Sequence, residues 1–356
     1  MGGAEKVILA FHKLFPRAPI YTSIYNKKAL PEFNRADVRT SYLQNLPFAK
    51  NKHQLYLNLM PSVFERFDLN EYDIVISSSH SCAKGIITKP QTLHICYCHT
   101  PMRYAWEDSI NYIKGYEINP LVKLIAPYLM HKIRIWDKLS ADRVDSFIAN
   151  SNYIQNRIYK YYRKPSSVIH PFVNTKEFSV GDDRRDYYLA VGRLTPYKKF
   201  DLLVETFNQT GLPLKIVGTG VEMKKLQQKA RPNIEFLGHV SDQVRNELYK
   251  KAKALIFPQL EDFGITPLEA MASGCPVIAY GKGGALETVI DKKTGILFKK
   301  QDREELKKAI RRFVLAKFDS NKIREHAENF DVEIFNDKFL DLLEKKWAKW
   351  KKEMYL

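Results

Sequence analysis

The chain has 356 residues, which is long for a single hydrophobic core, so we expect two domains. Its composition, 45% hydrophobic and 27% charged, is typical of a globular protein, and we find neither an apolar run of membrane-spanning length nor the pattern of a signal peptide. The formal net charge of +17 leans towards the N-terminal half and is compatible with nucleic acid, anionic lipid or phosphorylated small molecules as partners.

The chain opens with "MGGAEKVILAFHKLF", where two glycines precede an amphipathic segment. This order is typical of a turn between a strand and a helix, yet no strand precedes it in the sequence. A terminal glycine pair is commonly a flexible start or a cloning remnant, and the residues alone leave that alternative open. The continuation, to "PIYTSIYN", has helical spacing and then a strand-like segment.

Apolar, β-branched runs bounded by turn residues predict buried strands along the rest of the chain. They cover 72–79, 93–99, 146–151, 187–194, 214–220, 234–240, 254–259 and 275–281. Helical spacing is found between the later strands, in 198–210, 221–230, 241–252 and 266–274. Strands that alternate with helices in this way predict βα units and parallel sheets.

A polar, turn-rich segment over 170–186 separates the two series of strands, so we place a domain boundary near it. This predicts a first domain over 1–170 and a second over 171–335. The tail, 336–356, has the spacing of a long amphipathic helix.

Glycines dominate the predicted carboxyl ends of the second domain's strands, where parallel sheets bind ligands. They occur in Gly192-Arg193, Gly218–Gly220, Gly238-His239, Gln259–Thr266 and Gly281–Gly284. Glycine allows the backbone to approach a ligand closely, so the pattern indicates a nucleotide-binding crevice.

The stretch "EDFGITPLEAMASG" predicts an anion site at the start of a helix. Thr266 suits the N-cap and Pro267 the first helical position, which leaves the N–H groups of Gly264 and Ile265, with that of Thr266, for a diphosphate. "GRLTPYK" (192–198) adds Arg193, which can bind two phosphate oxygens, and Lys198, a mobile positive charge.

Simpler interpretations compete for each of these side chains. "TPLE" fits a capping box, and on spacing alone this structural role for Glu269 is favoured over binding a ribose. Glu261 could be an ordinary loop acid, Arg193 a surface ion-pair partner, and Lys198 a solvated lysine. "GTG" at 218–220 lacks the third glycine and the downstream acid of a dinucleotide fingerprint.

His99 closes the strand "LHICYCH" and should emerge at the carboxyl edge of the first domain's sheet. A single histidine at a strand end is more often a satisfied loop residue than a catalyst. Cys96 and Cys98 share one face of this strand while His99 points to the other, and no second ligand pair follows, so we expect no metal site. The four cysteines lack a regular framework, which favours reduced thiols and a cytosolic setting.

The motifs together resemble glycosyltransferase family 4, whose members are retaining enzymes with two Rossmann-like domains facing across a cleft, the GT-B fold. Glu261 and Glu269 match the family's E-x7-E motif, and Gly192 through Lys198 match G-R-L-x-x-x-K. "YCHTPMRYAW" and "FGITPLEAMASGCPVIAYGKGGALETV" are most similar to the branch of presumed mannosyltransferases in O-antigen and exopolysaccharide assembly.

The resemblance implies a role for each matching residue. Arg193 and Lys198 would hold the donor diphosphate, Glu269 the ribose, and Glu261 would lie near the sugar. The other implied donor contacts are Gly2, Gly3, Gly192, Gly218, His239, Gly264, Ile265 and Thr266, and His99 would meet the transferred sugar. Gly2 and Gly3 match the family's GG(x)E loop, so the first domain, which would bind the acceptor, is expected to lack the strand before it. A longer product with such a strand should then be more stable and more active. The C-terminal helix is expected to cross back to the first domain.

The implied activity is transfer of a sugar, expected to be mannose from GDP-mannose, to a hydroxyl of a lipid-linked or polysaccharide acceptor. No metal or other cofactor is expected, because the cations and the helix start can stabilise the diphosphate. Basic residues interleave with aromatic ones in "NPLVKLIAPYLMHKIRIWDKL" and "YIQNRIYKYYRKP", which raises the hypothesis of an anionic membrane surface as partner, at the inner face of the plasma membrane. The alternatives are a catalytically impaired relative, or a basic protein that binds membrane or nucleic acid without transferring sugar; no nucleic-acid module is visible.

Overall fold

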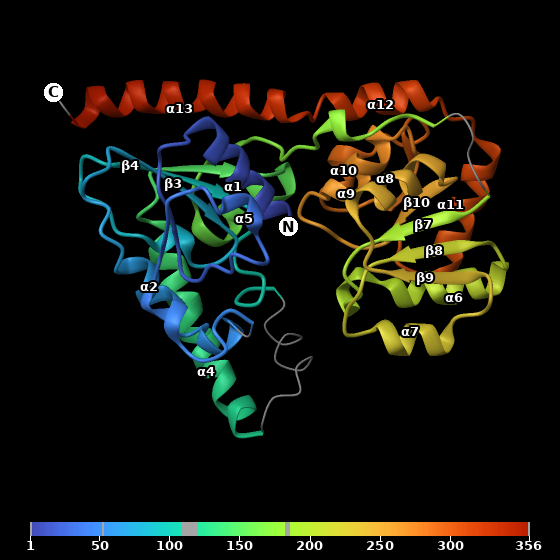
Figure 1. Ribbon diagram of the computed structural model, residues 1–356, viewed down its shortest axis with the longest axis horizontal. Coiled ribbons are helices and arrows are strands. Elements are labelled where there is room, and N and C mark those ends of the chain that lie inside the picture. Colours follow the sequence, from blue (N-terminus) through green and yellow to red (C-terminus); the bar gives the residue numbers. More distant parts are fainter. Residues whose placement is uncertain (1, 52, 108–119, 182–185, 355–356) are drawn as a thin grey trace. The chain divides into compact units, whose positions relative to one another are not determined.

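The computed structural model describes residues 2–51, 53–107, 120–181 and 186–354. The chain divides into two compact units (Figure 1). Unit 1 contains Met1–Ile169 and Asn336–Leu356, and unit 2 contains His170–Phe335. Each unit is built around a parallel sheet covered by helices, which confirms the predicted α/β class with two Rossmann-like domains.

The described residues of unit 2 form a six-stranded parallel sheet in the order β12-β11-β10-β7-β8-β9. Its strands are β7 (Tyr188–Val191), β8 (Leu214–Val217), β9 (Ile234–Gly238), β10 (Ala254–Phe257), β11 (Val277–Tyr280) and β12 (Gly295–Phe298). Five of these were predicted from their apolar runs, whereas β12 was not. Since β8 and β9 lie on one side of β7 and β10 to β12 on the other, the strand order reverses between β7 and β10. Ligands bind at the carboxyl ends of strands at such a point.

Helices cover both faces of this sheet. They are α6 (Phe200–Thr210), α7 (Met223–Lys229), α8 (Asp242–Lys251), α9 (Ile265–Ala272), α10 (Ala285–Thr288), α11 (Arg303–Leu315) and α12 (Ser320–Glu328), with short 3-10 turns at Thr175–Glu177 and Pro196–Lys198. One buried cluster joins Phe207 of α6 and Ile310 of α11 to the sheet, and another joins Tyr249 of α8, Met271 of α9 and Ile323 of α12 to the opposite face.

The described part of unit 1 has a four-stranded parallel sheet, in the order β3-β4-β5-β6, and a separate parallel pair, β1-β2. The strands are β1 (Ile20–Thr22), β2 (Val38–Thr40), β3 (Ile74–Ser79), β4 (Leu93–Cys98), β5 (Ser146–Ala149) and β6 (Ser166–Val168). The helices are α1 (Gly3–Leu14), α2 (Met60–Glu65), α4 (Pro120–Ala141), α5 (Asn152–Tyr162) and α13 (Val332–Met354), with 3-10 turns at Pro31–Phe33, Tyr42–Asn45, His53–Tyr56 and Ala83–Gly85. The C-terminal residues form one long helix, α13, and its residues from Asn336 onward belong to unit 1.

The described residues of the predicted linker are bonded to the rest of unit 2. Val173 bridges to Asp331 in unit 2, and the Asp331 carboxylate accepts hydrogen bonds from the Thr175 backbone N–H at 3.0 Å and from its hydroxyl at 2.5 Å. Phe172 and Phe335 pack with ring centroids 4.9 Å apart. Residues 182–185 lie outside the described part.

Candidate functional site

The carboxyl ends of β7, β8 and β9 are held together by main-chain hydrogen bonds. The Gly192 N–H donates to the Val217 carbonyl at 3.0 Å, and the Gly218 N–H donates to the Gly238 carbonyl at 2.7 Å. A Cβ on Gly218, where φ is +131°, would lie 2.0 Å from the Gly192 carbonyl oxygen. The close approach therefore requires glycine at 218, as the sequence pattern predicted for this edge.

Lys198 and Glu261 form an ion pair between the turn after β7 and the loop after β10. Their side chains are only 16% and 17% exposed, so this is a sheltered pair and not a contact on open surface. The Lys198 ammonium also lies 5.3 Å from the centroid of the Tyr197 ring. The interpretation of Lys198 as a solvated lysine is wrong, and two residues that the motifs singled out separately are in direct contact.

The glycines after β11 allow their loop to pack closely against the loop that carries Glu261. The Gly284 N–H donates to the Glu261 carbonyl at 3.0 Å, and a Cβ on Gly284 would lie 2.1 Å from Phe263 Cα. Gly283 has φ of +64°, and its Cβ would lie 2.4 Å from the same Glu261 carbonyl. Larger residues would separate the loops, so these glycines fix the backbone that carries Glu261.

Helix α9 begins two residues earlier than its sequence predicts. Its N-cap is Gly264, with φ of +94°, and Ile265 is the first helical residue, so the predicted N-cap at Thr266 is wrong. Pro267 is then the third helical residue. The amides of Ile265 and Thr266 have no carbonyl one turn earlier in the helix to bind, and α9 starts directly after the Glu261 loop. An anion placed there would meet these donors and the positive end of the helix dipole.

Glu269 does not form the predicted capping box, because the helix starts too early for it to occupy the third position. It is 7% exposed and accepts a hydrogen bond from the Tyr249 hydroxyl at 3.1 Å, while Arg245 Nε lies 3.8 Å from the same carboxylate oxygen. Burial by itself lowers the pKa of Arg245, but the negative charges of Glu269 and Asp242 outweigh it and the net direction is upward. Burial, with the Glu269 charge added, raises the pKa of Tyr249 well above its usual value, so it remains a hydroxyl donor.

Arg193 and His239 are exposed at the strand ends. Arg193 follows β7 directly and, within the described ranges, its guanidinium has no hydrogen-bond or ion-pair partner. His239 follows β9, the edge strand beyond β8. The structure thus brings together Lys198, Glu261 and the start of α9, while His239 lies further along the same edge.

In unit 1, His99 follows β4 and is half-buried. Its Nε2 is 2.8 Å from Ser78 Oγ, and its carbonyl accepts a hydrogen bond from Asn150 Nδ2 at 2.9 Å. Burial lowers the pKa of His99 to about 3, with a further contribution from His80, so the imidazole is neutral near pH 7. Ser78 and Asn150 were not predicted as functional residues, although each is the last residue but one of a predicted strand, 72–79 and 146–151.

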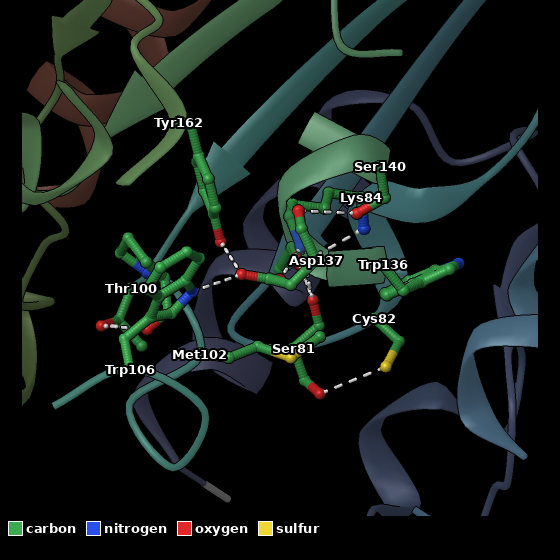
Figure 2. A network of polar contacts seen from close by, with 12 residues as sticks. Ser81, Cys82, Lys84, Thr100, Met102, Trp106, Trp136, Asp137, Ser140 and Tyr162 are labelled. Carbon is green, nitrogen blue, oxygen red and sulfur yellow. Dashed lines mark hydrogen bonds and ion pairs between the residues drawn. The ribbon is translucent and has the colours of Figure 1, made fainter. Parts of the chain in front are cut away.

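A buried polar network anchors the segment that follows His99 (Figure 2). Asp137 of α4 forms an ion pair with Lys84, and it accepts hydrogen bonds from Trp106 Nε1 at 2.7 Å and from the Tyr162 hydroxyl at 2.9 Å. Lys84 and Asp137 are 1% and 0% exposed. Because Trp106 lies at the end of the "YCHTPMRYAW" motif, the network fixes this motif to α4 and α5.

Gly2 and Gly3 lie in unit 1 at the start of α1. Gly2 is the N-cap in an extended conformation, and its N–H donates to the Glu5 carboxylate at 3.0 Å. Both glycines are exposed. Their placement corresponds to the helix side of the predicted turn.

The cysteine residues of β4 belong to the core. Cys96 and Cys98 are buried in a cluster with Phe147 and Tyr162. Within the described part of the chain, no disulfide forms and no group of three His, Cys, Asp or Glu side chains is arranged to hold a metal ion. Among the described helices, none is both long enough and apolar enough to cross a membrane.

Two family models match the chain. Residues 1–177 match the model described as glycosyltransferase family 4, and residues 174–330 match the model described as glycosyl transferases group 1.

Three curated relatives illustrate the similarity. An uncharacterized glycosyltransferase of Methanocaldococcus jannaschii, MJ1178, is 32% identical over 184 residues, which span 50% of this chain and 52% of the relative. The alpha-1,3/1,6-mannosyltransferase ALG2 of Dictyostelium discoideum is 25% identical over 74% of this chain and 70% of its own length. The O-antigen chain mannosyltransferase RfbU of Salmonella typhimurium is 28% identical over 55% of this chain and 62% of its own.

Solved structures share the fold at low sequence identity. Anabaena Alr3699/HepE, determined with UDP, has a TM-score of 0.70 at 18% identity over 97% of this chain and 96% of its own. Sucrose-phosphate synthase of Thermosynechococcus elongatus has a TM-score of 0.70 at 17% identity, with 98% and 94% of the two chains covered.

Proposed function

Since the chain belongs to glycosyltransferase family 4, we propose that it transfers mannose from GDP-mannose to a hydroxyl of a lipid-linked or polysaccharide acceptor, with retention at the anomeric carbon. The observation that carries this proposal is the contact between Lys198 and Glu261 beside the first turn of α9. It places a cation, a carboxylate and free amides at the point where the strand order reverses.

The diphosphate of the donor is the group that this arrangement suits best. Breaking the bond from the sugar to the dianionic diphosphate adds a further negative charge to the departing diphosphate, and its stabilisation is the main electrostatic task of the reaction. This stabilisation does not require a divalent cation, because it can come from Lys198, Arg193 and the backbone amides of Ile265 and Thr266. When the diphosphate binds, Lys198 exchanges part of its contact with Glu261 for phosphate oxygens, which leaves the Glu261 carboxylate available to a sugar hydroxyl.

Glu269 is suited to the ribose of the donor. A buried carboxylate held by Tyr249 and charge-balanced by Arg245 can accept hydrogen bonds from two neighbouring hydroxyls. The names of the relatives favour mannose as the sugar, since two of those described above are mannosyltransferases. GDP as the carrier is carried over from the resemblance of the sequence motifs to the mannosyltransferase branch, whereas Alr3699/HepE was determined with UDP, so the donor has to be measured.

His99 is proposed to contact the transferred sugar. With a pKa of about 3 its imidazole is neutral near pH 7, so it acts as a hydrogen-bond partner and not as a general acid. We assign no protein nucleophile: the acceptor attacks from the face that the diphosphate leaves, and the departing phosphate helps to take up the acceptor proton.

A panel of donors tests this function. The melting temperature and the release of nucleoside diphosphate are measured with GDP-mannose, GDP-glucose, UDP-glucose and UDP-galactose, in the presence of EDTA. The proposal predicts the largest stabilisation and the fastest release with GDP-mannose. A preference for a UDP-sugar would replace the donor while keeping the reaction, and no response to any donor would favour a catalytically impaired relative.

A membrane surface is proposed as the second partner, at the inner face of the plasma membrane where lipid-linked acceptors lie. Helix α4 exposes Ile125, Tyr128, Ile135 and Leu139 at spacings that place them along one face, with exposed Lys132 between them. Apolar and aromatic side chains on one helical face with basic neighbours are typical of helices that lie in a membrane interface.

Liposome flotation distinguishes this surface from a general effect of positive charge. Vesicles with and without anionic lipid are compared for the unaltered chain, for Ile135→Ser/Leu139→Ser, and for the control pair Val314→Ser/Leu315→Ser, which removes even more exposed apolar residues from α11 of unit 2. Only the α4 variant should lose binding. Equal binding by all three would remove α4 from the proposal, and a salt-sensitive affinity for duplex DNA that survives excess GDP and UDP would favour a nucleic-acid binder.

A further inference from the structure

His170, the first residue of unit 2, contacts both of the loops that meet at Glu261. Unit 1 includes the chain up to Ile169, so the backbone passes into unit 2 at His170. The His170 ring stacks on Phe263, and its Nε2 lies 2.9 Å from a carboxylate oxygen of Glu287. Phe263 belongs to the loop after β10 that carries Glu261, and Glu287 belongs to α10, which follows the glycines after β11.

Phe263 lies between the Glu261 carboxylate and the first turn of α9. Its side chain is buried, and the next residue is Gly264, the N-cap of α9 with φ of +94°. The amides of Ile265 and Thr266 follow directly, and these are the donors proposed for the diphosphate. A movement of the Phe263 ring would therefore be transmitted to the backbone that presents them.

Phe263 is confined on two sides. On its main-chain side, a Cβ on Gly284 would lie 2.1 Å from Phe263 Cα, so the two backbones are in close contact. On its side-chain side, the ring centroid lies 5.3 Å from that of His170 at an interplanar angle of 19°, and 6.0 Å from that of Phe330 at 52°. Both separations are within the range of favourable aromatic pairs, and the near-parallel stack with His170 fixes the plane of the Phe263 ring.

Glu287 fixes the orientation of the His170 ring. Both side chains are half-buried, so the contact is sheltered from solvent. The Glu287 N–H donates to the Gly284 carbonyl at 3.0 Å, and the Gly284 N–H donates to the Glu261 carbonyl at 3.0 Å. His170 is thus connected to the loop of Glu261 by two routes, one through the Phe263 ring and one through α10.

The segment by which the chain leaves unit 2 packs against the same rings. Phe330 lies 5.6 Å from His170 between ring centroids, and its carbonyl accepts a hydrogen bond from the Val173 N–H at 3.0 Å. Val173 also bridges to Asp331, and unit 2 ends at Phe335. The residues at both crossings of the chain are therefore in contact with the ring that stacks on Phe263.

We propose that His170 is a positioning residue for the donor: its ring, stacked on Phe263, keeps the start of α9 in the conformation that binds the diphosphate. His170 itself contacts neither phosphate nor sugar in this assignment. Because coupling between two sites is reciprocal, a bound diphosphate should in turn stabilise the residues around His170 at both crossings. The inference rests on the proposed function, since it requires that α9 binds the donor diphosphate.

Nucleotide affinity tests the positioning role. Binding of GDP and of UDP is measured by titration calorimetry for the unaltered chain, His170→Ala, His170→Phe and the control His326→Gln. The control removes a ring from the same cluster, where His326 packs on Phe330 and its Nε2 lies 2.9 Å from the Thr288 carbonyl oxygen. His170→Ala should weaken binding of the preferred nucleotide by about fivefold or more. His170→Phe keeps a ring on Phe263 and should recover most of that loss, and His326→Gln should bind as the unaltered chain does.

Amide exchange tests the coupling with and without nucleotide. Without ligand, His170→Ala should speed exchange of the Gly284 and Glu287 amides by roughly tenfold, and His326→Gln should change it much less. In the unaltered chain, the preferred nucleotide should slow exchange in 172–175 and 329–335 by roughly threefold or more, and His170→Ala should remove this response.

The outcomes separate this inference from the proposed function. If the unaltered chain binds a nucleotide and His170→Ala binds it equally well, with only a lower melting temperature, His170 is a structural residue and the inference alone is overturned. Unchanged exchange of Gly284 and Glu287 in His170→Ala would overturn it as well. If the unaltered chain binds neither GDP nor UDP, the proposed function fails and the inference fails with it.

Discussion

The Lys198 ammonium has two competing partners in the proposed reaction, Glu261 and the donor diphosphate. In the structure it contacts Glu261, and both side chains are sheltered from solvent. This pairing keeps a positive charge at the strand ends without a bound anion. Arg193, which is exposed and directly follows β7, has no such partner in the described ranges and is available for the outer phosphate.

We predict that Arg193→Ala or Lys198→Ala lowers turnover by roughly a hundredfold, comparable to the loss of one preorganised donor in other enzymes. Steady-state release of GDP from GDP-mannose measures this change. Lys224→Ala, which removes an exposed lysine from α7, is the matched control and should keep the original rate. Unchanged rates in both site variants would contradict the assignment of Arg193 and Lys198 to the donor diphosphate.

The Tyr249 hydroxyl is expected to position Glu269 for the ribose. Tyr249→Phe keeps the packing but removes the hydrogen bond, so the KM for the donor should rise by about five- to tenfold, the equivalent of a bond of roughly 1 kcal/mol, with a smaller change in kcat. Tyr187→Phe removes a comparable hydroxyl bond, to the Leu248 carbonyl, and serves as the control. A loss of thermal stability with an unchanged KM would mean that Tyr249 is only structural.

The fold stabilises the neutral forms of two histidines, His94 in β4 and His99 directly after it. Burial lowers the pKa of His94 to about 4 and that of His99 to about 3. Each ring has a serine of β3 as its partner, since His94 Nε2 lies 2.8 Å from Ser77 Oγ and His99 Nε2 lies 2.8 Å from Ser78 Oγ. Protonation would place an uncompensated charge between two strands of the unit 1 sheet.

This predicts a loss of stability in acid. Below about pH 6.5 the unfolded chain binds a proton at each histidine, whereas the folded chain does so only near pH 4 or below, so stability falls as the pH falls through this window. Each histidine contributes at most about 1.4 kcal/mol per pH unit. The free energy of unfolding, measured by denaturant between pH 4 and pH 8, should depend less steeply on pH in His94→Gln. The same slope in both chains would contradict this account.

At the level of elements, the strands in apolar runs and the short strand β1 could be predicted from sequence, whereas β2, β6 and β12 could not. β6 and β2 have only three residues each and are largely polar, and β12 is a four-residue run after a turn. The start of α9 was misplaced because Thr-Pro is a strong start signal, whereas the chain uses Gly264 at φ of +94°. Local patterns predict the conformation of residues that are close in sequence, whereas the loop before this cap packs against Gly283 and Gly284, which follow β11.

The same limit applies to the candidate site. Glycines at strand ends and the spacing of Glu261 and Glu269 could be recognised in the sequence. Three contacts join residues that are 20 to 63 positions apart in the sequence. They are the contact of Lys198 with Glu261, the hydrogen bond from the Tyr249 hydroxyl to Glu269, and the buried ion pair of Lys84 and Asp137. The spacing of residue types along the sequence does not predict such contacts, because they form only when the folded sheet brings its loops together.

For the whole molecule, the proposed reaction needs both units. The residues assigned to the diphosphate and ribose lie in unit 2, whereas His99 and the Gly2-Gly3 turn lie in unit 1. The basic charge of the chain is consistent with a polyanionic donor and an anionic surface, but it does not by itself distinguish an enzyme from a binding protein. Sugar transfer makes that distinction.

The most direct measurement follows GDP release and the anomeric configuration of the product with GDP-mannose and a polyprenyl-diphosphate-linked glycan acceptor, in EDTA, by NMR. We expect GDP release by the unaltered chain, an α-mannoside product, and a rate at least roughly a hundredfold lower in Lys198→Ala. A β-linked product would contradict retention. The absence of transfer with GDP-mannose, or an equal rate in Lys198→Ala, would contradict the central claim that the strand ends of unit 2 bind and activate this donor.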